Sequence, residues 1–172
     1  MKQVTDSFAQ NALLQNAAKE LFAALLAKGM TLSSAESCTG GLIAKCMTDI
    51  SGSSAVFYGA CVTYTNEVKC GLLGIDEQLI AQHTEVSSAC AAAMASAVRK
   101  KLGTDIGIST TGFAGPTGGT EKDPVGTVYI GISTKENTLT ERFSAPKDAD
   151  HSAVRALSAA RAMELALEST CV

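Results

Sequence analysis

The fold of this chain is decided by the stretch Ala35-Glu36-Ser37-Cys38-Thr39-Gly40-Gly41, where a strand pattern gives way to a helix pattern. Residues 30–34 favour a β-strand, and residues 42–47 favour a helix. Ser37 or Thr39 is therefore expected to cap the helix, and the paired glycines let another group approach the backbone closely. The free N–H groups of a helix start suit an anion, either a phosphate or a developing oxyanion. An ordinary capped helix start explains the same pattern equally well.

Outward from this stretch, the hydrophobic periodicity predicts alternating helices and strands. We expect one mixed sheet covered by helices on both faces, which is a three-layer α/β/α sandwich, formed by a single domain over residues 1–172. The near-continuous apolar run at 55–65 indicates a buried strand. The predicted helices are 8–28, 38–49, 66–72, 76–82, 88–101 and 148–168, and the predicted strands are 30–35, 55–65, 105–110, 125–133 and 138–144.

Composition bounds the class of protein. The 172 residues are 46% hydrophobic and 18% charged, which is typical of a globular, soluble domain. The net charge of −3 and the absence of a basic stripe argue against nucleic-acid binding. No apolar run approaches the ~20 residues of a membrane span. The first residues lack the apolar core of a secretory signal, so we expect a cytoplasmic protein.

The cysteines indicate neither a disulfide framework nor a metal site. They form no C-x-x-C pair, and most lie in apolar segments, as buried reduced thiols of a cytosolic protein do. Because zinc-ligand spacing is absent, we expect no metal and no cofactor. The six positions are Cys38, Cys46, Cys61, Cys70, Cys90 and Cys171.

Two glycine-bearing loops, 37–41 and 111–119, each follow a predicted strand. Neither is a Walker loop or a G-x-G-x-x-G loop. Loops at the same end of an open α/β sheet tend to share a crevice, which would place Ser37 opposite the second loop. The alternative for 111–119 is a flexible surface loop.

A serine nucleophile needs a base, and the sequence offers three. His83 follows a short helix and His151 lies at an exposed helix start, so structural roles are favoured for both. Lys69 follows the 55–65 strand and is flanked by apolar residues. A desolvated lysine can act as a base in a Ser–Lys pair, but residues alone favour a solvated helix lysine here.

Four further stretches, with residues 35–41, carry a resemblance to a known family. They are Tyr64-Thr65-Asn66-Glu67-Val68-Lys69, Gln82-His83-Thr84-Glu85-Val86-Ser87, Gly112-Phe113-Ala114-Gly115-Pro116-Thr117-Gly118-Gly119 and Pro124-Val125-Gly126-Thr127-Val128. Their identity and order resemble the CinA C-terminal domain family over nearly the whole chain. Longer members of that family carry another domain in front, and none is expected within this chain.

The resemblance implies a metal-free Ser–Lys amidase of pyridine-nucleotide salvage. Its small-molecule substrate would be nicotinamide mononucleotide, whose carboxamide is hydrolysed to nicotinate mononucleotide and ammonia. Carried over by motif, Ser37 is the nucleophile and Lys69 its base. Tyr64 would orient the lysine or the substrate.

The same resemblance implies a set of substrate-binding residues. The N–H groups of Thr39, Gly40 and Gly41 would form an oxyanion hole or hold the phosphate. The loop with Thr111, Gly112 and Gly115 would line the other side of the site. Arg155, near the start of the last helix, would suit a phosphate bidentately.

One departure from the family precedes the last helix. Relatives carry Gly-Asp-Arg there, whereas this chain reads Ala145-Pro146-Lys147-Asp148-Ala149-Asp150-His151, so that Lys147 is the candidate replacement cation. The alternatives to the amidase are a nucleotide-binding regulatory protein without efficient catalysis and an amidase for another small amide. A homo-oligomer is also expected, since the Ala-rich helix at 88–101 could serve an interface.

Overall fold

The computed structural model describes residues 2–171, with side chains described from residue 7 onward. Six α-helices and five strands alternate along this part of the chain, and a short 3-10 helix spans Ser53–Ala55. The helices are α1 (Lys2–Lys28), α2 (Leu42–Thr48), α3 (Asn66–Leu73), α4 (Glu77–His83), α5 (Ser88–Leu102) and α6 (His151–Ser169). The strands are β1 (Leu32–Glu36), β2 (Phe57–Val62), β3 (Ile106–Gly112), β4 (Thr127–Ser133) and β5 (Thr138–Ser144).

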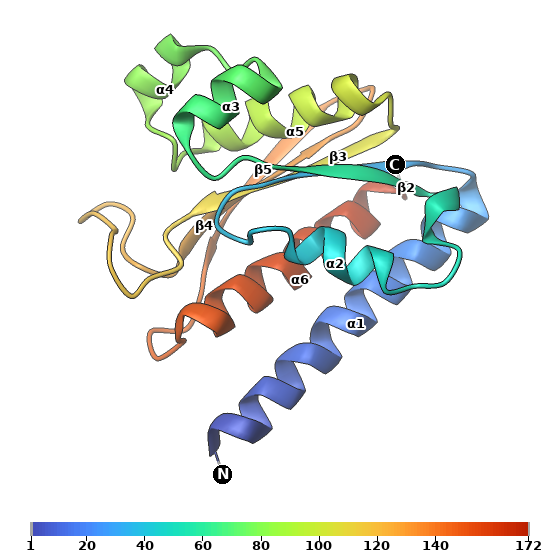
Figure 1. Cartoon of the computed structure of the whole chain (residues 1–172), viewed down its shortest axis with the longest axis horizontal. Helices are drawn as coiled ribbons and strands as arrows, with labels where there is room; N and C mark the ends of the chain where they lie inside the picture. The colour runs from blue at the N-terminus through green and yellow to red at the C-terminus, as the bar shows by residue number, and fades with distance from the viewer. Residues whose placement is uncertain (1, 172) are drawn as a thin grey trace.

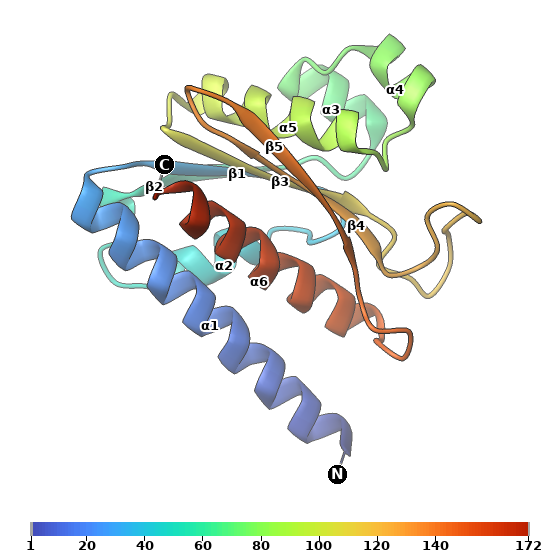
Figure 2. The same cartoon turned by 180° about the vertical axis from the view of Figure 1, so that it is seen from behind.

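The strands form one mixed sheet in the order β2-β1-β3-β4-β5. Strand β1 pairs in parallel with both β2 and β3, whereas β4 runs antiparallel to β3 and β5. Helices α1, α2 and α6 cover one face of the sheet, and α3, α4 and α5 cover the other (Figures 1 and 2). The predicted α/β sandwich with a mixed sheet is therefore confirmed.

Close packing of α5 on the sheet depends on two glycines. A Cβ atom at Gly107 of β3 would lie 2.3 Å from the carbonyl oxygen of Ala95, and one at Gly131 of β4 would lie 2.5 Å from that of Ala91. Because neither distance leaves room for a side chain, the helix backbone lies directly on the two strands. The buried face of α5 is consequently used inside the domain, and its alanines give no independent support for the expected oligomer.

The prediction of a buried strand at 55–65 is wrong. Strand β2 occupies the edge of the sheet, and 56% of Tyr58 and 48% of Val62 are exposed. An edge strand has no neighbour on one side, so a continuous apolar run does not require burial on both faces. The strand is also shorter than expected, because Ser53–Ala55 forms a 3-10 helix before it.

The start of α2 is built differently from the sequence expectation. The helix begins at Leu42, its N-cap is Gly41 with φ of 91°, and neither Ser37 nor Thr39 caps it. The fully buried carboxylate of Glu36, the last residue of β1, accepts hydrogen bonds from the backbone N–H groups of Ile43 and Ala44 at 3.1 and 2.9 Å. A carboxylate reaches past the glycine turn, which a shorter hydroxyl side chain does not.

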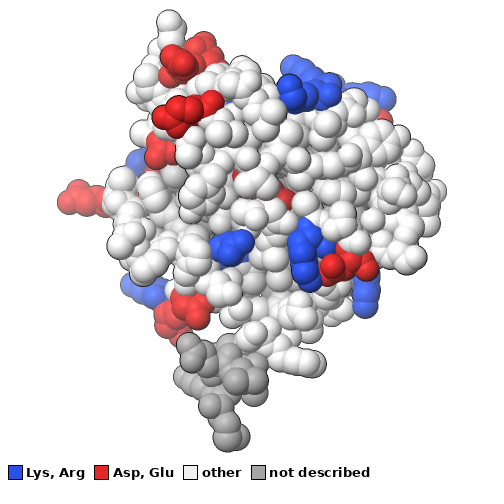
Figure 3. Space-filling model, viewed as in Figure 1, with Lys and Arg blue, Asp and Glu red and all other residues white. Residues whose placement is uncertain are grey.

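Charged side chains are dispersed on the surface. On the face shown in Figure 3, lysines and arginines lie in small separate groups with broad uncharged areas between them. Among the described residues, no helix is both long enough and apolar enough to cross a bilayer.

The Glu36 network gives a first testable prediction. Besides the two N–H groups, the carboxylate accepts hydrogen bonds from Ser34 Oγ at 3.1 Å and Thr39 Oγ1 at 2.8 Å. In Glu36→Gln, the side-chain amide turns an NH₂ group toward these donors, so the free energy of unfolding should fall by about 2 kcal/mol. Urea denaturation measures this change, with the exposed Glu20→Gln as control. Equal stability of the two variants would contradict the capping role.

Candidate active site

Ser37 lies in a cavity at the end of the sheet where β1 and β3 terminate. The cavity has a volume of about 270 Å³. Five segments form its wall: the turn after β1, the region of α3, the connection between α4 and α5, the end of β3 with the loop after it, and the start of α6. Ligand sites of open α/β sheets lie at this end of parallel strands. The lining residues are Ser37, Cys38, Tyr64, Lys69, Glu85, Val86, Thr111, Gly112, Phe113, Ala114, Gly115, Thr117 and His151.

Lys69 points into this cavity and contacts Ser37. Only 1% of the lysine is exposed, so the solvated lysine favoured by the residues alone is wrong. Its Nζ donates hydrogen bonds to Ser37 Oγ at 3.2 Å and to the carbonyl oxygen of Thr63 at 3.1 Å. Helix α3, which starts after the N-cap Thr65, turns the side chain inward from its first turn. The nucleophile and base expected from the resemblance are thus within hydrogen-bonding distance.

Burial makes this amine easier to deprotonate. Removal from water lowers the pKa of Lys69 below its ordinary value, because burial disfavours the charged form. When the amine is neutral, an N–H bond can still donate to Thr63, which leaves the lone pair directed toward Ser37. Burial raises the pKa of the neighbouring Cys38 thiol to about 12. The thiol is therefore neutral near pH 7, and Ser37 is the better candidate nucleophile.

The backbone after Ser37 offers N–H groups to a developing oxyanion. The N–H of Ser37 donates to the carbonyl oxygen of Thr110 at 2.9 Å, and that of Gly40 donates to Ser37 at 3.1 Å. Within residues 7–171, the N–H groups of Cys38 and Thr39 have no such acceptor. Cys38 also lines the cavity, so its N–H occupies the position that follows the nucleophile in known oxyanion holes.

The end of β3 and the loop after it form the opposite wall, where Thr111, Gly112 and Gly115 all line the cavity. Thr111 Oγ1 donates to the carbonyl oxygen of Glu85 at 2.6 Å and so ties this loop to the segment between α4 and α5. Tyr64 also lines the cavity, but 67% of it is exposed, which places it at the mouth.

Four expected binding residues do not reach the Ser37 cavity. Thr39 is fully buried, and Gly40 and Gly41 do not line the cavity. The guanidinium of Arg155 donates to the carbonyl oxygen of Thr39 at 2.7 and 3.3 Å, and its side chain lines a separate hollow beside Phe8 and Leu42. The glycine turn runs toward α6, on the other side of the sheet from α3, so these residues stabilise the turn rather than face Ser37.

His151 lines the cavity instead of the expected Lys147. Its Nδ1 lies 2.6 Å from the carbonyl oxygen of Gly115, so the helix start of α6 is fastened to the loop after β3. The structural role that the sequence favours for this histidine is consistent with that hydrogen bond. His83, by contrast, lies at the end of α4 and lines a neighbouring chamber.

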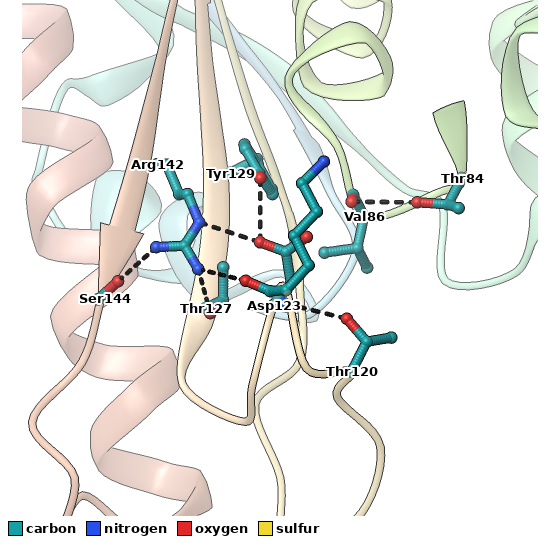
Figure 4. Close-up of polar contacts among 9 residues, drawn as sticks. Thr84, Val86, Thr120, Asp123, Thr127, Tyr129, Arg142 and Ser144 are labelled. Carbon is teal, nitrogen blue, oxygen red and sulfur yellow. Dashed lines mark hydrogen bonds and ion pairs between the residues drawn. The ribbon is translucent and has the colours of Figure 1, made fainter. Parts of the chain in front are cut away.

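That neighbouring chamber has a volume of about 580 Å³ and shares Glu85, Val86 and Phe113 with the Ser37 cavity. On its far side, the Asp123 carboxylate accepts hydrogen bonds from Tyr129 Oη at 3.0 Å and Arg142 Nε at 2.9 Å (Figure 4). The sequence analysis assigned no role to these residues. Each lies on a different segment and becomes a neighbour only through the tertiary fold.

Within the described residues, no group of three His, Cys, Asp or Glu side chains is arranged to hold a metal ion. All six cysteines are free, and four of them are buried: Cys38, Cys46, Cys61 and Cys90.

The burial of Lys69 has a consequence for stability that needs no substrate. Its folded-state pKa lies below the ordinary 10.5, so the charged lysine destabilises the fold at lower pH, and this penalty vanishes as pH rises to 10.5. The unfolding free energy of Lys69→Met minus that of the wild type should therefore fall between pH 7 and pH 10.5. Denaturant titrations at several pH values measure it. A difference that stays flat with pH for Lys69→Met would contradict the lowered pKa.

Comparison with known proteins places this chain in a family. The model of the CinA C-terminal domain matches residues 14–170. A CinA-like protein from Dictyoglomus turgidum is 51% identical over 108 residues, which cover 63% of this chain and 26% of the relative. A CinA-like protein from Shewanella denitrificans is 45% identical over 148 residues, which cover 86% of this chain and 35% of the relative. This chain thus spans about a quarter to a third of the length of these curated relatives.

Solved structures of similar proteins have the same fold. A CinA superfamily protein from Klebsiella pneumoniae has a TM-score of 0.87 and 31% identity, covering 92% of this chain and 98% of its own. A competence/damage inducible protein, CihA, from Agrobacterium tumefaciens has a TM-score of 0.87 and 32% identity, and the match covers 93% of this chain and 96% of that protein's chain. Together with the match over residues 14–170, these likenesses show that the chain belongs to the CinA C-terminal domain family.

Proposed function

We propose that this protein is an amidase that hydrolyses the carboxamide of nicotinamide mononucleotide to nicotinate mononucleotide and ammonia. The observation that carries the proposal is the buried Lys69 amine, 3.2 Å from Ser37 Oγ in a cavity of the domain. A lysine buried without a carboxylate partner in the described structure is costly for stability, and such costs are typical of catalytic groups. The proposed setting is pyridine-nucleotide salvage in the cytoplasm.

The proposed reaction uses the Ser–Lys pair twice. Neutral Lys69 takes the proton of the Ser37 hydroxyl while Oγ bonds to the carboxamide carbon, and the carbonyl oxygen becomes an oxyanion facing the N–H of Cys38. The lysine ammonium then gives its proton to the amide nitrogen, the C–N bond breaks, and ammonia leaves an acyl-enzyme. In the second half, Lys69 takes a proton from water as that water attacks the ester carbon, and returns it to Ser37 Oγ.

The dimensions of the site favour a substrate larger than a simple amide. The Ser37 cavity, at about 270 Å³, lies below the range of roughly 300–1,000 Å³ that is usual for small-molecule sites, whereas the adjoining chamber adds about 580 Å³. With the carboxamide at Ser37, the ribose and phosphate would extend into this chamber. Lys122 lines the chamber and forms no ion pair among the described residues. We therefore propose that Lys122, rather than Arg155, binds the phosphate group of the substrate.

The activity assay also decides between the alternative functions. Ammonia release is measured for nicotinamide mononucleotide, nicotinamide and NAD. Binding of the mononucleotide without ammonia release would instead identify a nucleotide-binding regulatory protein. Release from a different small carboxamide alone would identify an amidase with another substrate.

The catalytic pair gives the next prediction. Ser37→Ala should reduce kcat by several orders of magnitude, roughly 10⁴-fold or more, because no acyl-enzyme can form. Lys69→Arg should be equally impaired, since arginine keeps its proton. Wild-type activity should rise with pH as Lys69 loses its proton at a pKa below 10.5, and should survive exhaustive chelation. Near-normal turnover by either variant would refute the proposed mechanism.

Phosphate recognition gives a separate prediction. Nicotinamide mononucleotide should be hydrolysed with a kcat/KM about tenfold or more above that of nicotinamide riboside, because only the nucleotide offers a dianion to Lys122. Lys122→Gln should narrow this preference, whereas Arg155→Gln should leave the preference in place. If the preference for the nucleotide over the riboside is lost in Arg155→Gln and kept in Lys122→Gln, Arg155 binds the phosphate, as expected from the resemblance, and the role proposed for Lys122 is wrong.

A further inference from the structure

We propose that Glu85, together with the ring of Phe113, selects substrates whose nicotinamide ring carries a positive charge. The inference deepens the proposed amidase function and rests on it. It concerns the junction between the Ser37 cavity and the adjoining chamber, where both residues line both spaces.

The charge at this junction is unbalanced. Glu85 is the one carboxylate among the residues that line the Ser37 cavity, and it is half-buried. Within residues 7–171, its side chain forms neither an ion pair nor a hydrogen bond, whereas Asp123 in the chamber is paired with Arg142. A partly desolvated carboxylate without a directly bonded cation is unfavourable, and a cationic ligand bound beside it would relieve that cost.

The backbone around Glu85 is held in a definite position. The preceding residue, Thr84, has φ of 68° and ψ of 164°, and it is the one non-glycine residue with positive φ in the described chain. This conformation is strained for a threonine and persists only where surrounding contacts enforce it. Thr84 Oγ1 donates to the carbonyl oxygen of Val86 at 3.1 Å (Figure 4), and Ser87 Oγ donates to that of Thr84 at 2.9 Å. With the bond from Thr111 to Glu85, these contacts direct the segment toward the cavity.

The ring of Phe113 is positioned on the same junction. It packs against a buried group formed by Val86, Ala91 and Tyr129. On another side the loop backbone comes close, since a Cβ atom at Gly118 would lie 3.2 Å from Phe113 Cδ1. A planar cation between an aromatic face and a carboxylate is stabilised by both, through the ring quadrupole and through charge.

The chemistry of the proposed substrate matches this junction. The ring nitrogen of nicotinamide mononucleotide is bonded to ribose and is therefore a pyridinium cation, whereas free nicotinamide is neutral. With the carboxamide carbon at Ser37 and the phosphate in the chamber, the ring occupies the space between them. Glu85 thus distinguishes a charged ring from a neutral ring of the same shape. Hydrophobic contacts alone discriminate poorly between two such rings.

Charge recognition at Glu85 is also coupled to Lys69. The negative charge of Glu85 raises the pKa of Lys69 and partly opposes the effect of burial. The other titratable groups around the amine are the thiols of Cys38, Cys70 and Cys90, whose pKa values are raised by burial so that they are neutral near pH 7, the exposed carboxylate of Glu67 on α3, and Tyr64 and His151 in the cavity wall. A pyridinium ring beside Glu85 cancels the one anionic charge in that wall and so favours the neutral, basic form of the lysine.

The test compares two substrates that differ only in ring charge. One is nicotinamide mononucleotide, and the other is the neutral C-nucleotide in which a benzamide ring replaces the nicotinamide ring. The variant Glu85→Gln keeps the shape of the side chain, and Glu67→Gln removes an exposed carboxylate outside the cavity as the matched control. The kcat/KM ratio of the charged to the neutral substrate should fall roughly tenfold in Glu85→Gln and remain unchanged in Glu67→Gln. Because the variants share the same substrates, intrinsic amide reactivity cancels from the comparison.

A binding measurement keeps this inference separate from the amidase proposal. In the Ser37→Ala background, calorimetry should show tighter binding of the charged nucleotide, and Glu85→Gln should remove that preference. If the wild type releases no ammonia but this pattern holds, the amidase proposal fails and the inference stands. If ammonia is released but Glu85→Gln changes neither the kcat/KM ratio nor the affinity ratio of the charged to the neutral substrate, the inference is overturned.

The coupling to Lys69 has its own readout. The acid limb of the kcat/KM profile should lie at lower pH in Glu85→Gln than in the wild type, because the attractive charge beside the lysine is gone. The exposed Glu67 is screened by water, so Glu67→Gln should leave the limb nearly in place. Identical shifts in both variants would show a general effect of net charge and would overturn the role of Glu85.

Discussion

The contact on which the rest of the structure depends is the buried carboxylate of Glu36 at the end of β1. It accepts hydrogen bonds from two backbone N–H groups in the first turn of α2 and from the hydroxyls of Ser34 and Thr39. One side chain thus joins the strand, the glycine turn and the helix. Ser37 directly follows it, and the serine backbone N–H donates to Thr110 of β3. The position of the candidate nucleophile is thereby fixed by the centre of the sheet rather than by a surface loop, which provides the preorganisation that catalysis requires.

The sheet separates structural from chemical contacts around the 35–41 stretch. On the side of α3 to α5, Ser37 meets Lys69 and opens into the cavity. On the side of α6, the glycine turn is held by Arg155 through the carbonyl oxygen of Thr39. Gly40 has φ of 61°, a conformation that favours glycine, and a Cβ atom there would lie 3.1 Å from that guanidinium, so the glycine is explained without a substrate contact. The glycines thus support the site, and from this turn only Ser37 and Cys38 line the cavity.

Charge is distributed unevenly in the two connected cavities. Asp123, which is buried and lines the chamber, is satisfied by hydrogen bonds from Tyr129 and Arg142. By comparison, the buried amine of Lys69 has hydrogen bonds but no carboxylate bonded to it, and the half-buried carboxylate of Glu85 has no bonded partner among the described residues. Groups left in this state destabilise a fold, and their presence in one cavity is the physical reason to regard it as a place for chemistry.

The sequence by itself determined the order of elements and the mixed sheet between helical layers, and it singled out Ser37 as a candidate nucleophile, because periodicity and glycine turns are local properties. It did not determine that β2 is an edge strand, that Glu36 rather than a hydroxyl begins α2, or that Lys69 is buried. Nor did it separate Arg155 from the cavity or bring Glu85 and Phe113 to its junction. Those facts depend on which distant segments pack together and which charges lose their water, and only the tertiary structure decides that.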